Sequence, residues 1–254
     1  MNDVLWEKIK RASEESIAHP GINSKPLPKN ESVHDPEIYL FRHGQTHDNI
    51  NRIFSGWRDS ELTDEGIMQV TELAEKLKDK HIDLCITSPL TRSKDTAHIA
   101  LQFHPDVVFE EDERILERNY GELTGHSKEK ALEEDPDLTA RYRRSYDFPP
   151  PKGESIKMVE ERVFPFCTEL IERIKHNNIN VAISAHSNSM RAIRRYFEKL
   201  SIVEEITLEN PLGCDYSQYV VHNQNNTEAA PYFTRKDLDD LIVPNESLFE
   251  ALDD

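Results

Sequence analysis

The sequence predicts a single α/β domain, a three-layer sandwich in which a mostly parallel sheet carries helices on both faces. Between residues 37 and 221, short runs rich in apolar and β-branched residues alternate with segments whose apolar residues recur every three or four positions. Strands that alternate with helices pair in parallel, because each helix provides the long crossover that parallel neighbours need. The length of 254 residues suits one such domain with a sizeable core.

The individual elements follow from this pattern. The predicted strands are 37–41, 82–87, 107–109, 180–185 and 216–221. The predicted helices between them are 63–77, 90–103, 155–175 and 188–200. Thr63 is expected at the N-cap of the first of these helices, because a threonine hydroxyl accepts a hydrogen bond from a free backbone N–H of the first turn.

The two ends of the chain differ in composition from the middle and predict a division into three regions. Residues 1–36 form an N-terminal extension, with a short helix at 3–17 followed by a linker rich in Pro, Asn and Ser. Residues 37–221 form the folded domain. Residues 222–254 form a tail with eight acidic and two basic residues, in which a polar loop is expected at 223–231 and a short helix at 237–252.

The composition also excludes several classes of function. A formal net charge of −17 argues against a nucleic-acid or anionic-membrane binder. No run approaches the roughly 18 apolar residues of a membrane-spanning helix, and the N-terminus lacks the apolar core of a signal peptide. Cys85, Cys167 and Cys214 form no metal or disulfide pattern, which indicates free thiols in a reducing compartment and predicts a cytoplasmic protein.

Two histidines follow directly on predicted strands. His43 comes after the first strand, and His186 comes after the fourth. Parallel strands place ligands at their carboxyl ends, so the two side chains are expected to meet there. Arg42 precedes His43, Arg92 lies just beyond the second strand, and Gly44 allows a sharp turn without a Cβ clash. The guanidinium group of an arginine can bind two phosphate oxygens at once, and an imidazole ring can attack phosphorus. These four residues therefore predict a site that binds a phosphate group.

A metal site at the same place is the less favoured interpretation. His47 lies four residues after His43, and an H-x-x-x-H pair can hold a metal ion from one helix. His43 is expected at a junction between strand and turn, where this spacing does not bring the rings together. We therefore predict no metal ion.

Six segments carry motifs that occur in a fixed order along the chain. They are LFRHGQTHDN, FSGWRDSELTDEG, ITSPLTRSKDTA, ERNYGELTG, YRRSYDFPPP and SAHSNSMRAI. Together they resemble the histidine phosphatase superfamily and, within it, the cofactor-dependent phosphoglycerate mutases. The resemblance covers about residues 38–221 and implies a phosphoglycerate mutase-like fold.

The resemblance implies a role for each matching residue. His43 is similar to the nucleophile that becomes phosphohistidine, and Glu117 is similar to the proton donor and acceptor. Arg42, Arg92 and His186 resemble the phosphate pocket. The remaining implied substrate-binding residues are Asn49, Ser55, Gly56, Tyr120, Lys128, Arg143, Arg144, Ser187 and Asn188.

Two chemical conditions accompany these roles. Phosphoryl transfer needs positioning and positive charge, which Arg42, Arg92 and a protonated His186 are expected to supply without a metal. The proton donor needs a pKa near the working pH. Burial raises the pKa of Glu117 and nearby arginines lower it, and the sequence leaves the balance open.

If each residue is considered alone, without its motif, several of them have a simpler interpretation. Glu117 could pair with Arg118 or Arg114 on the surface. Arg141, Arg143 and Arg144 could form the solvated end of a helix, and Lys128 could be an ordinary surface lysine. The motif order favours the site roles.

This chain departs from the family pattern at three points. Ser187 stands where a glycine usually follows the second histidine, and its hydroxyl would either add a donor to the phosphate or crowd it. The segment PLGCD at 211–215 differs from the usual PTG. An insert that longer members carry after PPP is absent, which leaves the oligomeric state open.

The resemblance therefore implies a phosphoglycerate mutase that interconverts 3-phosphoglycerate and 2-phosphoglycerate, with 2,3-bisphosphoglycerate as the phosphate donor. The alternative is a metal-independent phosphatase of the same superfamily, in which water takes the phosphate. A non-enzymatic sensor of phosphorylated ligands is a third class. All three imply a small phosphorylated molecule as the partner.

Overall fold

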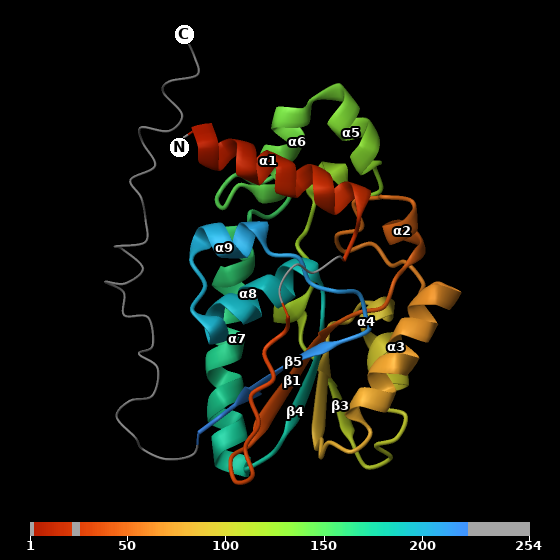
Figure 1. Cartoon of the computed structure of the whole chain (residues 1–254), viewed down its shortest axis with the longest axis vertical. Coiled ribbons are helices and arrows are strands. Elements are labelled where there is room, and N and C mark those ends of the chain that lie inside the picture. Colours follow the sequence, from red (N-terminus) through yellow and green to blue (C-terminus); the bar gives the residue numbers. More distant parts are fainter. Residues whose placement is uncertain (1–2, 22–25, 223–254) are drawn as a thin grey trace.

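A central sheet organises the protein (Figure 1). Within residues 3–21 and 26–222, which the computed structural model describes, five strands form one sheet in the order β3-β2-β4-β1-β5. The strands are β1 (Glu37–Arg42), β2 (Leu84–Thr87), β3 (Val108–Glu111), β4 (Val181–Ala185) and β5 (Tyr216–Val220). Only β5 runs antiparallel to its neighbour β1, so the predicted mostly parallel α/β fold is confirmed.

Helices cover both faces of the sheet, as predicted. The helices in the described residues are α1 (Asp3–Ala18), α2 (His47–Ile50), α3 (Asp64–Leu77), α4 (Thr91–Ala100), α5 (Lys128–Glu134), α6 (Pro136–Arg144), α7 (Ile156–Asn177), α8 (Ser187–Glu198) and α9 (Ile202–Thr207). Thr63 caps α3 by accepting a hydrogen bond from Gly66 N, as expected. The loop and helix predicted at 223–231 and 237–252 lie outside the described residues.

Four helices were not predicted: α2, α5, α6 and α9. The two longest of these are α5 and α6. Their sequences, KEKALEE and PDLTARYRR, are mostly charged or polar, so their apolar residues are too few to reveal a helical period. Both carry local start signals instead. Ser127 caps α5 and Asp135 caps α6, where Pro136 occupies the first helical position.

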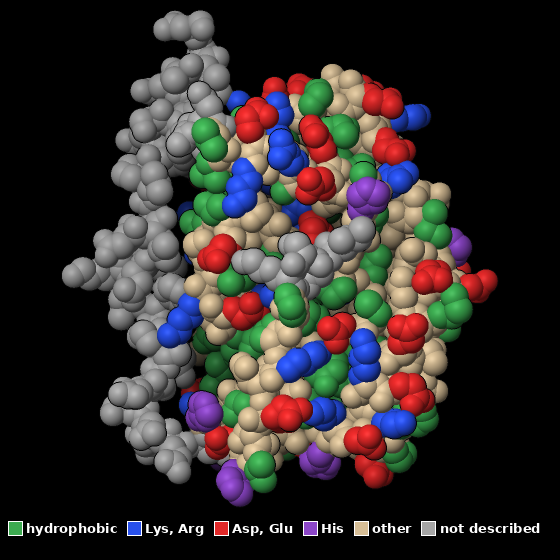
Figure 2. All heavy atoms as spheres, in the orientation of Figure 1, with side chains coloured by type: hydrophobic (Ala, Val, Ile, Leu, Met, Phe, Trp, Pro, Cys, Tyr) green, Lys and Arg blue, Asp and Glu red, His purple; other side chains and the backbone are tan. Residues whose placement is uncertain are grey.

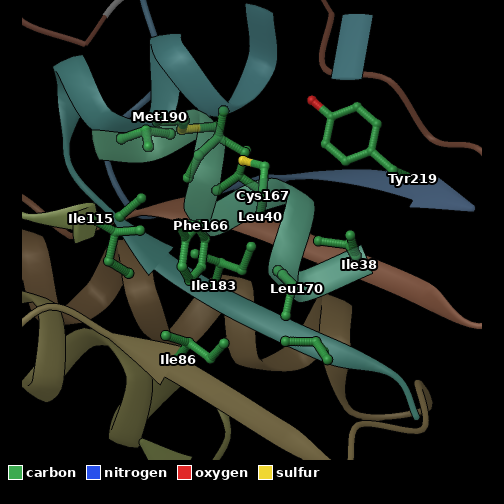
Figure 3. Packing of buried hydrophobic residues seen from close by; sticks show 14 of the residues in the cluster. Ile38, Leu40, Ile86, Ile115, Phe166, Cys167, Leu170, Ile183, Met190 and Tyr219 are labelled. Carbon is green, nitrogen blue, oxygen red and sulfur yellow. The ribbon is translucent and has the colours of Figure 1, made fainter. Parts of the chain in front are cut away.

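The core is divided by the sheet into two layers. Alternate residues of β1 point to opposite faces, so Ile38 and Leu40 pack with α7 and α8, whereas Tyr39 and Phe41 pack with α3 and α4. Figure 3 shows the first layer, in which Phe166 and other side chains of α7 lie against the strands. Each fully buried side chain of this size contributes about 1.5–3 kcal/mol to folding.

This topology creates a crevice at the carboxyl ends of β1 and β4. The two strands are parallel neighbours, but the chain leaves β1 toward α3 on one face and leaves β4 into α8 on the other. Chains that diverge to opposite faces leave an open space between the strand ends, where open α/β sheets bind ligands.

Helix α1 covers this end of the sheet (Figure 1). It packs against α6 and α9, and Ile9 of α1 is buried in a small cluster with Ile156 and Ile206. Lys10 pairs with Asp137 of α6 at 2.8 Å. The helix predicted at 3–17 is therefore present, and it lies over the crevice.

The exposed surface mixes both signs of charge. Figure 2 shows acidic and basic side chains interspersed over one face of the molecule.

In the described part of the chain, none of the helices has the length and apolar character needed to cross a bilayer.

Candidate active site

His43 lies at the first turn beyond β1. Its backbone N–H donates to Ala185 O at 3.1 Å, and its ring Nδ1 lies 2.7 Å from Gly44 O. A carbonyl oxygen only accepts, so Nδ1 carries the proton and Nε2 keeps its lone pair. The turn packs so tightly on α3 that a Cβ at Gly44 would lie 2.6 Å from Gly66 O, which explains the glycine.

His186 lies beside His43, because β1 and β4 end in register. The two ring centroids are 5.2 Å apart, and Nε2 of His186 lies 2.7 Å from Ser88 Oγ. Burial and the charges of Arg92 and Arg42 hold the pKa of both rings well below the usual range. The expectation of a protonated His186 is therefore wrong for the protein without a bound anion, because two buried guanidinium groups already occupy its surroundings.

Arg42 and Arg92 supply buried positive charge around the two rings. Arg42 Nη1 donates to Asn210 O at 2.9 Å, while its Nε meets no acceptor within the described residues. Arg92 donates from Nη1 to Arg58 O and from Nη2 to Gly56 O, each at 2.8 Å, and so fixes the loop that contains Gly56. Burial lowers the pKa of both arginines, because the nearby carboxylates do not fully offset the cost of removing their charges from water.

Glu117 faces the same pocket and is buried. Its Oε1 accepts hydrogen bonds from Arg118 N at 2.7 Å, Asn188 N at 3.0 Å and Asn188 Nδ2 at 2.9 Å. Burial raises the pKa of Glu117, but these hydrogen bonds and the charges of Arg92 and Arg42 outweigh it and bring the pKa below its usual range. The balance that the sequence left open therefore favours the carboxylate. The alternative of a surface pair with Arg118 or Arg114 is wrong, and Arg114 pairs with Asp112 and Glu169 instead.

Tyr120 and Lys128 lie farther out and face the narrow pocket. The guanidinium of Arg118 lies 4.6 Å from the ring centroid of Tyr120. Burial raises the pKa of Tyr120, but Arg118, Lys128 and Arg143 outweigh this effect and bring it to about 7. Burial lowers the pKa of Lys128 to about 8, so Lys128 is no ordinary surface lysine.

Arg143 and Arg144 end helix α6 and are buried rather than solvated, so the alternative of a solvated helix end is wrong. Arg143 donates to the hydroxyl of Ser13 at 2.7 Å and to that of Ser16 at 2.8 Å. Arg144 donates to Ser16 Oγ at 2.7 Å and pairs with Glu209. Burial lowers the pKa of Arg143 to about 9 and that of Arg144 to about 10.

These side chains enclose one pocket. The predicted site residues that line it are Arg42, His43, Asn49, Ser55, Gly56, Arg92, Glu117, Tyr120, Lys128, Arg143, Arg144, Ser187 and Asn188. His186 lies behind the ring of His43 rather than on the pocket wall. Six basic and two acidic side chains line the pocket, in a chain with an overall charge of −17. The pocket therefore suits a small anion with several negative charges.

The pair His43 and His47 does not form a metal site. His47 begins α2 and is exposed, whereas His43 precedes that helix and is buried. Across residues 3–21 and 26–222, no group of three or more His, Cys, Asp or Glu side chains is arranged to hold a metal ion.

Sequence reasoning missed five residues of the pocket wall. They are Ser16, Pro20, Gly21, Arg191 and Glu209. Arg191 carried a signal, because it follows Asn188 by three positions and so shares its face of α8. Burial raises the pKa of Glu209, but the charges of Arg144 and Arg191 bring it to about 2. No pattern in the sequence connected Glu209, or residues 16–21, with the strand ends.

Fold and site define a class of protein: an α/β protein with two neutral histidines and an excess of arginines in a pocket at the switch point of its sheet. A sequence model of the family described as Histidine phosphatase superfamily (branch 1) matches residues 38–227. The chain belongs to this family.

Relatives by sequence carry a more specific name. A 2,3-bisphosphoglycerate-dependent phosphoglycerate mutase of Parvibaculum lavamentivorans is 38% identical over 182 residues, which cover 69% of this chain and 86% of the relative. A protein of the same name from a Methylobacterium species is 41% identical over 162 residues, covering 61% of this chain and 77% of the relative.

Solved structures share the fold. A mycobacterial glucosyl-3-phosphoglycerate phosphatase in complex with VO3 superposes with a TM-score of 0.65 at 25% identity, covering 72% of this chain and 90% of that chain. A phosphoglycerate mutase of Bacillus anthracis superposes with a TM-score of 0.60 at 21% identity, covering 74% and 94%.

Proposed function

We propose that this protein is a 2,3-bisphosphoglycerate-dependent phosphoglycerate mutase, an isomerase that interconverts 3-phosphoglycerate and 2-phosphoglycerate. The observation that carries the proposal is the pocket, in which six basic side chains and two acidic ones surround a neutral His43. A three-carbon acid with a phosphate group matches that charge. The relatives at 38% and 41% identity support the same function.

His43 is the proposed nucleophile. Its Nδ1–H is held by Gly44 O, so the lone pair of Nε2 is available to attack phosphorus. The N–P bond forms as the bond from phosphorus to the leaving oxygen breaks, and the arginines stabilise the charge on the transferred group. 2,3-Bisphosphoglycerate loads His43 in this way, and the phosphohistidine then transfers its phosphate to the free hydroxyl of 3-phosphoglycerate as the N–P bond breaks. The bisphosphorylated product returns its original phosphate to His43, which releases 2-phosphoglycerate and restores the phosphohistidine.

Arg42 and Arg92 are the proposed residues that hold the transferred group, and His186 supports them from beside His43. Both arginines are buried, so their charge acts in a medium with little screening. The ring of His186 is neutral without a ligand, and it can gain a proton when a phosphate dianion beside it raises the pKa of the ring.

Glu117 is the proposed proton donor and acceptor. It is ionised without ligand, because hydrogen bonds and two arginines lower its pKa. Phosphate bound between the same arginines neutralises their effect and raises the pKa of Glu117, so that the carboxyl group can carry a proton to the leaving oxygen. Such a group contributes about 10²–10⁴-fold to the rate.

The outer ring of the pocket would hold the carboxylate of the substrate and, for the phosphate donor, its second phosphate. Tyr120, Lys128, Arg143 and Arg144 line this region. Nε of Arg143 and of Arg144 meets no acceptor within the described residues, and both atoms are buried. These free N–H groups can donate hydrogen bonds to an anion with several negative charges, such as 2,3-bisphosphoglycerate. The same arginines supply the positive charge that a metal ion would otherwise provide.

A coupled assay tests this proposal. The protein should convert 3-phosphoglycerate into 2-phosphoglycerate, and priming with 2,3-bisphosphoglycerate should increase the rate. Hydrolysis of p-nitrophenyl phosphate measured in parallel reports phosphatase activity. A protein that hydrolyses the small ester rapidly and forms no 2-phosphoglycerate, primed or not, contradicts the mutase assignment.

Hydrolysis is the second candidate activity. The mycobacterial structure with a TM-score of 0.65 is named a phosphatase, and a phosphatase needs the same inner pocket. In that case water, activated by Glu117, takes the phosphate from His43. The ratio of isomerisation to hydrolysis with 3-phosphoglycerate distinguishes the two candidates.

The cytoplasm is the proposed location. Cys85 and Cys167 are buried and free, and Cys214 is free and half-buried. Free thiols are stable in a reducing compartment, which supports the location that the cysteine pattern predicts.

A further inference from the structure

The N-terminal extension builds part of the pocket wall. Ser16 of α1, followed by Pro20 and Gly21, lines the pocket beside the outer arginines. This segment lies outside residues 38–227, the range that matches the family. A part of the chain outside the range that matches the family therefore reaches the region where the substrate carboxylate is expected to bind.

Ser16 connects the two outer arginines through one oxygen atom. Its Oγ accepts hydrogen bonds from Arg143 Nη2 at 2.8 Å and from Arg144 Nη2 at 2.7 Å, and it donates to Ser13 O at 3.0 Å. A hydroxyl group has one proton and two lone pairs, so Ser16 makes every hydrogen bond it can. It has no capacity left for the substrate. Instead it holds the Nη2 end of both guanidinium groups, while Ser13 holds Nη1 of Arg143, and Ile206 O and Glu209 also hold Arg144.

The partners that α1 offers to Arg143 are all neutral. Arg143 donates from Nη1 to the carbonyl and hydroxyl oxygens of Ser13, and from Nη2 to Ser16. Arg144 and Arg191 share the carboxylate of Glu209, but no carboxylate pairs with Arg143 in the described ranges. Hydroxyl and carbonyl oxygens orient a guanidinium without cancelling its charge, so Arg143 keeps a full charge for an incoming anion.

Contacts away from the pocket hold α1 in place. Ile9 is buried among residues of α7 and α9, and Ile17 is buried as well. Arg52 Nε donates to Ile17 O at 3.0 Å at the end of the helix. Removing one hydroxyl group at Ser16 therefore leaves these anchors intact, which separates its effect on the arginines from the docking of the helix.

We propose that Ser16 is a positioning residue for the substrate, which orients Arg143 and Arg144 toward the carboxylate or second phosphate of the ligand. The N-terminal extension is then a functional part of the substrate site. This inference rests on the proposed function only in taking the ligand to be a phosphorylated acid with a second anionic group.

The test compares three variants of the full chain. Ser16→Ala removes the hydroxyl group, Ser16→Thr retains it, and Ile9→Val weakens the packing of α1 without touching the arginines. For each variant we would measure KM and kcat with 3-phosphoglycerate, kcat/KM with p-nitrophenyl phosphate, the Tm, and the Kd of 3-phosphoglycerate by calorimetry. Calorimetry provides a measurement that does not depend on catalysis.

We expect Ser16→Ala to raise KM and Kd about tenfold, equivalent to about 1.4 kcal/mol. Hydrolysis of p-nitrophenyl phosphate should change less than about twofold, because a small ester uses the inner pocket alone. Ser16→Thr should behave like the wild type. Ile9→Val should lower the Tm without raising Kd.

Three results would overturn the inference: an unchanged Kd in Ser16→Ala, an equal rise of Kd in Ile9→Val, or a parallel loss of activity toward the small ester. A wild-type protein that binds 3-phosphoglycerate but forms no 2-phosphoglycerate would contradict the proposed function. The inference about Ser16 would stand in that case if Ser16→Ala still weakened binding.

Discussion

Replacing Arg143 by methionine removes a charge that the folded protein holds without a carboxylate partner in its described residues. The side chain is 8% exposed, and its guanidinium bonds to Ser13 and Ser16. An anion about 4 Å from a charge gains about 4 kcal/mol at an effective dielectric constant of about 20. One charge-assisted hydrogen bond contributes about 1.5–3 kcal/mol. A loss of about 2–4 kcal/mol lowers kcat/KM for 3-phosphoglycerate about 30-fold to 1,000-fold.

The stability of the same variant provides a second measurement. Burial lowers the pKa of Arg143 to about 9, so the unfolded chain binds this proton more tightly and the charge destabilises the fold at neutral pH. Methionine fills similar volume without a charge, so the Tm of Arg143→Met should not fall. Arg144→Met leaves the half-buried Glu209 with Arg191 alone, and its Tm should fall by about 2–4 °C per kcal/mol lost.

The assay follows formation of 2-phosphoglycerate in the primed enzyme, with hydrolysis of p-nitrophenyl phosphate as the control. Arg143→Met should hydrolyse the small ester within about twofold of the wild-type rate, because Arg42 and Arg92 remain. Equal loss of both activities, or a fall in Tm as large as that of Arg144→Met, would refute the reasoning. Either result would show that Arg143 stabilises the folded protein rather than binding the substrate.

The remaining predictions concern the inner pocket and its charges. Labelled bisphosphoglycerate should transfer one acid-labile, base-stable phosphate to the wild type and none to His43→Ala; retained label would exclude His43. Glu117→Gln should reduce kcat far more than it raises KM, whereas an unchanged kcat would remove Glu117 from the chemistry. Activity should survive EDTA, and its loss with recovery on adding zinc or manganese would require a metal. Finally, kcat/KM should fall as the pH rises through about 8, because Lys128 loses its charge there, and Lys128→Met should lack this step.

The parts of the fold that sequence patterns predicted are those that depend on local periodicity. Strands β1 and β4 are apolar enough to be buried on both faces, and α3 and α7 each carry an apolar stripe with a capping residue at the start. The helices α5 and α6 were missed because their stability comes from caps and from packing against α1 rather than from an apolar stripe.

The candidate site was predictable to the extent that it lies next to strand ends. His43 and His186 each follow a strand directly, so the parallel pairing of β1 with β4 brings them together. Ionisation was not predictable, because it depends on distances between charges. His186 stays neutral because it is buried and lies near two arginines. Glu117 stays ionised because hydrogen bonds from Arg118 and Asn188, together with the same arginines, outweigh its burial.

By itself, the sequence determined which elements form and which residue types follow each strand, because both depend on neighbours within a few positions. Only the tertiary structure decided that α1 closes the pocket, that Ser16 joins Arg143 to Arg144, and that Glu209 pairs with Arg144 and Arg191. These contacts join residues far apart in the chain, from 18 residues to more than a hundred, through single hydrogen bonds. A polar contact of this kind leaves no periodic pattern in the sequence, so its partner becomes evident only when the chain is folded.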